Sequence, residues 1–174
     1  METSYHELPY PNFNGSFWWP RLGVTMGINP TCENVAWFGR GPEENYIDRC
    51  WGSNIGWYEA GLDGLHTSYA RMQENGARTD TRKMTVTNQR GAGVKFTALS
   101  APFTFTAHDY TDKALTDAWH EYQLERVDST VVDIDLAQTG LGSSSCGPEA
   151  LDQYKLFLKD KDLTWKFRME IINE

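Results

Sequence analysis

Trp37-Phe-Gly-Arg-Gly-Pro-Glu-Glu-Asn-Tyr-Ile-Asp-Arg49 is the stretch of this 174-residue chain that says most about its fold. It mixes turn glycines, a proline, aromatic rings and opposed charges in an order that no regular helix or strand requires. Trp37 and Phe38 close an apolar strand, the two glycines allow backbone angles barred to other residues, and Pro42 stops a continuing ladder. Residues Trp37–Arg49 are therefore predicted to form a corner, a turn of fixed structure at the end of a strand.

The polar residues of this corner are interpreted as architecture rather than chemistry. Buried Trp and Tyr side chains need polar partners for their N–H and O–H groups, and the neighbouring charged residues supply them. Glu43 and Glu44 are sequence neighbours, so their side chains point to opposite sides of an extended backbone. We expect this pair to form salt bridges with Arg40 or Arg49.

Outside the corner, the spacing of turn-forming residues and the alternation of apolar and polar residues are typical of β structure. Candidate strands span residues 22–28, 34–38, 82–87, 94–99, 103–108, 121–126, 131–137, 154–158 and 163–171. Several alternate between apolar and polar residues, which predicts antiparallel sheets with one solvated face, and Asp133 and Asp135 are expected on that face. One short helix is predicted, with Thr111 as its N-cap and Ala118 near its end. The predicted fold class is an all-β, antiparallel β-sandwich.

Composition excludes several classes of partner and cofactor. The net charge of −8 repels phosphate backbones and anionic lipids, so neither nucleic acid nor a membrane is an expected partner. No apolar run approaches a membrane span and the amino terminus carries no secretory pattern, which predicts a cytoplasmic protein. Cys32, Cys50 and Cys146 are odd in number and widely spaced, so neither disulfides nor a zinc site is expected. No cofactor is predicted.

No catalytic residue is assigned from the sequence. A retaining glycosidase needs two carboxyl groups about 5–5.5 Å apart. Asp133 and Asp135 have a suitable spacing on one strand face, but strand alternation by itself explains two polar residues there. The histidines His66, His108 and His120 are scattered along the chain, and no metal-binding pattern is present.

Three further segments carry a resemblance to a known family. They are Pro20-Arg-Leu-Gly-Val24 before the corner, Gln73-Glu-Asn-Gly-Ala-Arg-Thr-Asp-Thr-Arg82 after it, and Gly140-Leu-Gly-Ser-Ser-Ser-Cys-Gly-Pro148 near the end. With the corner, they resemble the C-terminal, small-chain domain of the β-galactosidases of glycoside hydrolase family 2, in the same order. The resemblance covers residues 20–174, whereas residues 1–19 match nothing in it and are expected to be an irregular lead-in.

The resemblance implies a large curved β-sandwich similar to galactose mutarotases, with the first strands of the family's domain missing. In the family, hydrolysis of terminal β-galactosides such as lactose depends on carboxylates of a separate barrel domain. The chain is therefore expected to be a C-terminal domain or small subunit that helps to complete a galactoside site beside a catalytic domain, and not to be catalytic alone.

Two loops are the substrate-binding candidates that the resemblance implies. The first contains Gln73, Glu74, Asn75, Gly76 and Arg78, and the family's matching loop lies at the mouth of the active site. Its alternative is an ordinary hairpin turn, because Asn-Gly alone predicts one. The second is the glycine-rich loop, where Cys146 stands at a position at which some family members place a tryptophan that stacks on sugar.

Two other interpretations stay open at this stage. A stand-alone carbohydrate-binding or mutarotase-like sandwich would bind sugar on a concave sheet face with aromatics such as Trp57, Tyr58 and Trp119. In the second interpretation, the chain is a truncated product without a function. If strands are missing, unpaired sheet edges predict association with a partner subunit or a homo-oligomer.

Overall fold

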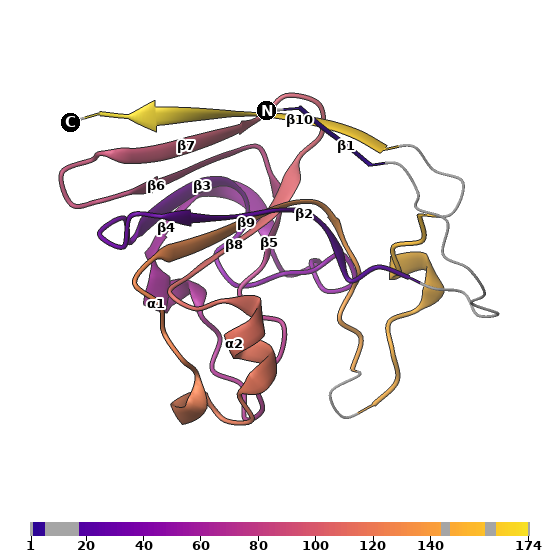
Figure 1. The fold of residues 1–174 in the computed structure, drawn as a ribbon. Helices are drawn as coiled ribbons and strands as arrows, with labels where there is room; N and C mark the ends of the chain where they lie inside the picture. Colours follow the sequence, from indigo (N-terminus) through magenta and orange to yellow (C-terminus); the bar gives the residue numbers. More distant parts are fainter. Residues whose placement is uncertain (1, 6–17, 144–146, 159–162, 174) are drawn as a thin grey trace.

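The computed structural model describes residues 2–5, 18–143, 147–158 and 163–173. In these residues, two antiparallel sheets pack face to face around a shared core (Figure 1). The six-stranded sheet has the order β1 (Glu2–Tyr5), β10 (Leu163–Ile172), β7 (Gly93–Ala98), β6 (Lys83–Thr87), β3 (Asn34–Gly41) and β4 (Asn54–Gly61). The four-stranded sheet has the order β2 (Arg21–Ile28), β9 (Thr130–Gln138), β8 (Phe103–His108) and β5 (Arg78–Thr81). The predicted all-β sandwich is confirmed.

The core between the two sheets is built from alternate residues of their strands. In the six-stranded sheet, Trp37, Phe96 and Phe167 are at most 1% exposed, and in the four-stranded sheet Phe105 and Ile134 are fully buried. Trp37 packs edge-on against Phe105, with 5.6 Å between the ring centroids, so the sheets meet at the strand that leads into the corner. Alternation along a strand puts every second side chain into this layer.

Seven of the nine predicted strands are present, with small shifts at their ends. The two that are wrong are 121–126 and 154–158. The first contains the 3₁₀ turn η1 (Glu121–Gln123) and no strand. The second begins at the end of the turn η2 (Asp152–Tyr154) and contains one isolated bridge, between Leu156 and Trp19, outside the named strands. Strands β4 and β5 and the short helix α1 (Leu62–Leu65) were not predicted.

The prediction that β8 and β9 have one solvated face is wrong. All six residues of β8 are buried, and Asp133 and Asp135 on β9 are 3% and 1% exposed. The predicted helix explains part of this cover: α2 (Asp112–Asp117), capped by the Thr111 side chain, brings Asp112 towards this face. The loop before β5 covers more of it, since His108 of β8 contacts the backbone of that loop. The sheet is therefore covered on both sides.

The amino-terminal segment is only partly irregular. Residues 2–5 of the predicted lead-in form β1, which pairs with β10 from Glu2 opposite Lys166 to Tyr5 opposite Leu163. In the described part of the chain, no helix is long and apolar enough to cross a membrane. Residues 6–17 of the predicted lead-in lie outside the described residues.

Candidate functional site

The corner after β3 is a scaffold, as its composition predicts. The indole Nε1 of buried Trp37 donates to the carbonyl oxygen of Arg40 at 2.9 Å, so the ring is fixed by the turn that follows it. Asn45, fully buried, accepts from the backbone nitrogen of Thr79 at 3.0 Å, and its own backbone nitrogen donates to Ala77 at 2.8 Å. These bonds attach the corner to the chain that enters β5.

Glu44 is the polar centre of the corner. Its side chain is 8% exposed, and it accepts from Arg49 Nη2 at 2.5 Å, from the backbone nitrogen of Gly76 at 2.9 Å, and from the hydroxyl groups of Tyr46 and Tyr69. The expected pairing of the two neighbouring glutamates with Arg49 is thus met by Glu44. Arg40 pairs instead with Asp80, at 2.6 Å. Through Gly76, the corner holds the loop that contains residues 73–78.

Asp48 attaches the corner to the glycine-rich loop. Its two carboxylate oxygens accept from the backbone nitrogens of Leu141, at 3.1 Å, and Gly142, at 2.7 Å. A side chain at Gly140 would stand 2.5 Å from the Asp48 carboxyl carbon, so only glycine allows this approach. Two loops far apart in the sequence are therefore held by neighbouring residues of one corner.

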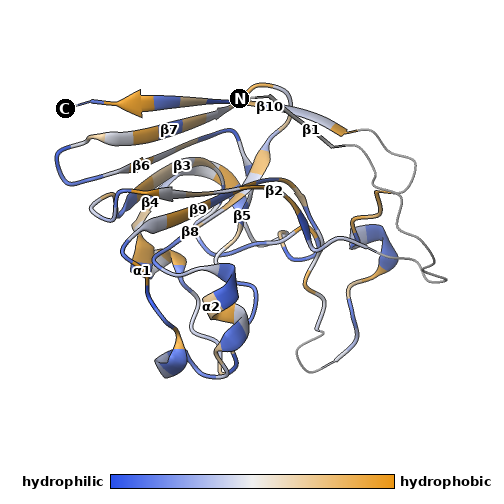
Figure 2. Cartoon of the chain, in the orientation of Figure 1, coloured by the Kyte–Doolittle hydropathy of each residue, from blue (hydrophilic) through white to orange (hydrophobic). Residues whose placement is uncertain are grey.

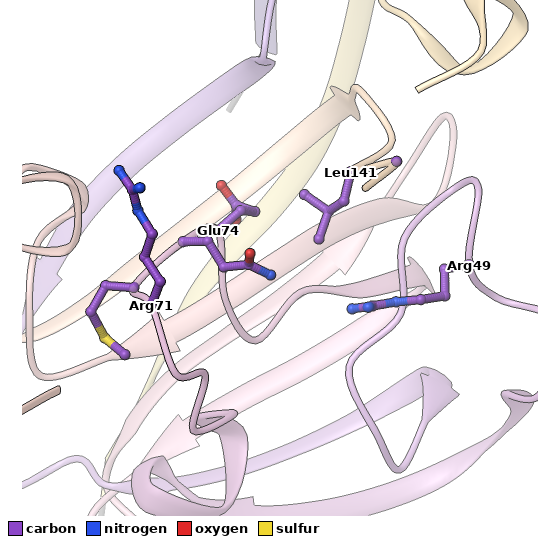
Figure 3. Close-up of a pocket in the computed structure, with 7 residues that line it drawn as sticks. Arg49, Arg71, Glu74 and Leu141 are labelled. Carbon is purple, nitrogen blue, oxygen red and sulfur yellow. The ribbon is translucent and has the colours of Figure 1, made fainter. Parts of the chain in front are cut away.

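A pocket of about 340 Å³ opens where these three segments meet. It is lined by Arg49 of the corner, by Arg71, Met72, Gln73 and Glu74 of the loop before β5, and by Leu141 and Gly142 of the glycine-rich loop. Figure 3 shows Glu74 between Arg71 on one side and Arg49 and Leu141 on the other. The volume falls in the range of small-molecule sites, roughly 300–1,000 Å³. Among these lining residues, Glu74 is the one carboxylate, so a retaining pair is not assembled here.

The residues predicted for the first loop divide into two groups. Gln73 and Glu74 line the pocket, whereas Asn75 and Arg78 are 1% and 2% exposed. Asn75 binds both backbone groups of Thr67, accepting from its nitrogen at 2.8 Å and donating to its oxygen at 2.6 Å. Gly76 has a φ of 76°, which explains the glycine.

Arg78 is a structural residue of the same loop. Its guanidinium donates to the carbonyl oxygens of Leu65 at 3.0 Å, Gly76 at 2.8 Å and Pro42 at 3.1 Å, and it lies over the Trp37 ring. Burial lowers the pKa of Arg78 from its ordinary value. Together with Asn75, it fixes the second half of the loop. Cys146 lies outside the described residues.

Behind Glu74, one arginine is surrounded by four carboxylates. Arg21 Nη2 forms a salt bridge with Glu74, and Nη1 lies 3.3 Å from Asp112, 3.3 Å from Asp133 and 3.8 Å from Asp135. Burial raises the pKa of Asp135 to about 7, although Arg21 opposes the shift. Burial likewise raises the pKa of Glu74 and of Asp112, again against Arg21. Burial lowers the pKa of Arg21 itself, but the four carboxylates outweigh it, so the net shift is upward.

Two histidines that are scattered in the sequence meet in the fold. His66 and His108 both contact Tyr110: His66 Nδ1 is 2.8 Å from the Tyr110 hydroxyl, and the His108 ring stacks on the tyrosine ring. Burial lowers the pKa of His108 to about 4, so its ring is neutral at physiological pH. Its Nε2 lies 3.1 Å from the carbonyl oxygen of Asn75. Among the described residues, no group of three or more His, Cys, Asp or Glu side chains is arranged to hold a metal ion.

The three aromatics of the alternative carbohydrate platform do not share a sheet face. Trp57 is 66% exposed and stacks against Phe38, whereas its neighbour Tyr58 packs against buried Trp37 on the core side. Trp119 follows α2 and lies under the guanidinium of Arg71. The single concave platform expected for a stand-alone module is therefore absent at these three residues.

Sequence reasoning missed most residues that line the pocket. Arg49 is named above as a salt-bridge partner of the corner, and Arg71, Met72 and Leu141 are not named as binding residues. Their position in the sequence could have identified these four residues as candidates. Each of them lies inside a segment that carries the resemblance, or within two residues of one. Only the fold shows that these segments converge.

Comparisons with known proteins point to the same family as the resemblance found in the sequence. A family profile described as beta galactosidase small chain matches residues 2–169. The β-galactosidase of Actinobacillus pleuropneumoniae is 34% identical over 166 residues, which are 95% of this chain and 15% of that protein. The Vibrio cholerae enzyme is 39% identical over 153 residues, 82% of this chain and 14% of its own, and the Kluyveromyces lactis enzyme is 31% identical over 148 residues, 85% and 14%. The chain thus spans about 15% of the length of these relatives.

Proposed function

Because this chain belongs to the β-galactosidase small-chain family, we propose that it completes the galactoside-binding site of a β-galactosidase whose catalytic domain is a separate unit. It matches a small part of full-length β-galactosidases and corresponds to one domain of a larger enzyme. The substrate class is that of a terminal β-galactoside, and the partner is the catalytic domain. We further propose that this assembly works in the cytoplasm.

One observation carries the proposal: the corner, the loop before β5 and the glycine-rich loop meet at a single pocket. Gln73 and Arg71 offer hydrogen-bond donors for sugar hydroxyl groups, and the amide oxygen of Gln73 also accepts. The exposed ring of Trp119 lies next to Arg71 and supplies an apolar surface of the kind that packs on a sugar ring. The pocket is open, which suits a site that a second domain closes.

The carboxylates near the pocket also support a model in which this chain contributes to sugar binding and the catalytic domain supplies the reacting groups. Glu74 is tied to Arg21 and is the one carboxylate among the residues that line the pocket, and Asp133 and Asp135 are buried behind it, so these residues do not offer a sugar two accessible carboxyl groups. The acid and the nucleophile therefore come from the partner domain. The isolated chain is expected to leave nitrophenyl galactosides intact.

A hybrid enzyme tests the proposal. In the Actinobacillus pleuropneumoniae β-galactosidase, the 166 matched residues are replaced by those of this chain. We expect the hybrid to hydrolyse nitrophenyl β-galactoside. Gln73→Ala in the hybrid should raise KM roughly three- to tenfold, since one hydrogen bond contributes about 0.5–1.5 kcal/mol.

The matched control is Gln89→Ala, an exposed glutamine in the turn between β6 and β7. It should leave KM unchanged. Equal KM values for the two variants in a folded, active hybrid would show that the pocket does not contact the galactoside.

A further inference from the structure

We propose that Arg21 is a positioning residue that latches Gln73 and Glu74, which form one wall of the pocket, onto the four-stranded sheet. The inference rests on the proposed function only in calling the pocket a sugar site. The latch itself is a property of this chain and is measurable without sugar.

The two halves of the loop before β5 are held in different ways. Asn75, Gly76 and Arg78 are fixed by hydrogen bonds to backbone groups and to Glu44, inside a buried setting. Glu74 is held by its salt bridge to Arg21 at the start of β2, and also by a hydrogen bond with the Gln138 side chain at the end of β9. The ion pair is therefore the charged contact that holds the pocket wall, whereas residues 75–78 next to it are held by buried hydrogen bonds.

Arg21 is itself held in place by the sheet. Its side chain is 18% exposed, and Asp133 and Asp135 of β9, which pairs with β2, lie on its Nη1 side. Asp133 is further fixed by the hydroxyl groups of Thr25 on β2 and Thr106 on β8, the latter at 2.9 Å. Three strands thus orient one guanidinium towards Glu74. A buried arrangement of this kind loses far more when one partner is removed than a surface pair does.

The charge balance of the cluster makes the latch sensitive to one proton. The groups that face Asp135 are Arg21 from β2, Asp133 from its own strand, Glu74 from the loop and Asp112 from α2. One cation faces four carboxylates, and the Oδ2 atom of Asp135 is buried without a hydrogen-bond partner. When Asp135 ionises, near pH 7, it repels Glu74 and competes for Arg21. The latch is therefore expected to be tighter below pH 7 than above it.

Limited trypsin digestion of the 174-residue chain tests the latch. Arg71 is exposed and precedes the pocket wall, so cleavage after it reports release of the wall, and cleavage after exposed Arg90 is the internal reference. We expect Arg21→Gln and Glu74→Gln each to raise the ratio of the first cut to the second roughly three- to tenfold. The double variant should match the single ones, because both remove the same ion pair.

The controls separate a latch from a general loss of structure. Glu170→Gln removes the partner of Lys95 on the six-stranded sheet and should not change the ratio. Arg21→Lys should restore part of the wild-type ratio. Additive effects of the two single variants, or equal acceleration of both cuts, would overturn the proposal.

The proton dependence is measured in the same assay. The ratio should rise between pH 6 and pH 8 in the wild-type chain and stay flat in Asp135→Asn. A wild-type slope in Asp135→Asn would show that Asp135 does not act on the latch. Failure of the galactosidase hybrid with a normal digestion pattern would contradict the proposed function alone.

Discussion

Trp37 joins the core to the corner and thereby to the pocket. Its ring fills the space between the sheets against Phe105 and Tyr58, and its N–H group fixes the turn at Arg40. Arg78 lies over the ring, 5.6 Å from its centroid, so the indole also supports the loop before β5. One residue thus contributes to stability and to the placement of a functional loop.

Replacement of Trp37 by alanine is expected to lower the free energy of unfolding by about 3–5 kcal/mol, the range for a large buried aromatic. Its exposed fraction is 1%, so a cavity is left. Denaturant melts measure the change. Trp57→Ala is the control: that ring is 66% exposed, and its loss should cost about 1 kcal/mol or less. An unchanged midpoint for Trp37→Ala would contradict the corner's role as architecture.

At the level of the element, β9 shows why a clean alternation does not settle which face is wet. Its apolar residues enter the core, and its two aspartates lie on the opposite face, where Arg21, α2 and the loop before β5 cover them. Covering this face placed carboxylates out of water, and Arg21 compensates their charge only in part, because one cation faces four carboxylates. The same element serves the core on one side and the latch on the other.

Burial of Asp135 predicts a pH dependence of stability with a definite sign. The pKa of this carboxyl rises from 3.8 to about 7 in the folded chain, so the folded state binds the proton more tightly than the unfolded state. The contribution of Asp135 is therefore fully present below pH 4 and is lost as pH rises through 7, at up to about 1.4 kcal/mol per pH unit.

Denaturant melts of the wild type and of Asp135→Asn between pH 4 and pH 8 isolate this contribution. The difference in unfolding free energy between the two should change across the window in favour of the variant at high pH. A constant difference would mean that Asp135 is ionised in the folded chain throughout.

In the described residues, the sandwich is open along part of β10, near one side of the six-stranded sheet. β1 pairs with β10 only along Leu163–Lys166 in the described chain. Beyond that, Met169 and Ile171 face the same way as buried Phe167 yet are 45% and 78% exposed. Figure 2 shows the end of β10 as a hydrophobic tip, and this end lies beyond the part of β10 that pairs with β1. Such an edge is a template for strand pairing.

The chain is accordingly expected to associate, either with itself or with another part of a β-galactosidase. Light scattering over a range of concentrations should show a mass that increases with concentration. Ile171→Lys should reduce this association, because it places a charge on the open face. Leu151→Lys, at a residue that is 66% exposed elsewhere, is the control and should have no effect. A monomer at every concentration would show that the open side is stable in water.

The sequence by itself determined seven of the strands, the corner and the family, but not the eight-residue strand β4. Alternation located the central strands because burial of one face selects every second residue, and Thr111 located α2 because a cap is a local interaction. The corner could be predicted from the sequence because glycine and proline restrict or widen their own backbone angles, which is a local effect. Strand β5 and the turn η1 were misjudged, because short segments take their structure from the neighbours that pair with them.

The tertiary structure alone decided the pocket, the latch and the burial of Asp133 and Asp135. Arg21, Glu74 and Asp135 are each separated by more than fifty residues, and only sheet pairing and loop closure bring them together. Which face of a sheet is covered depends on what later segments of the chain do, and that is a long-range property. Local patterns fix the elements, whereas contacts between distant segments fix the site.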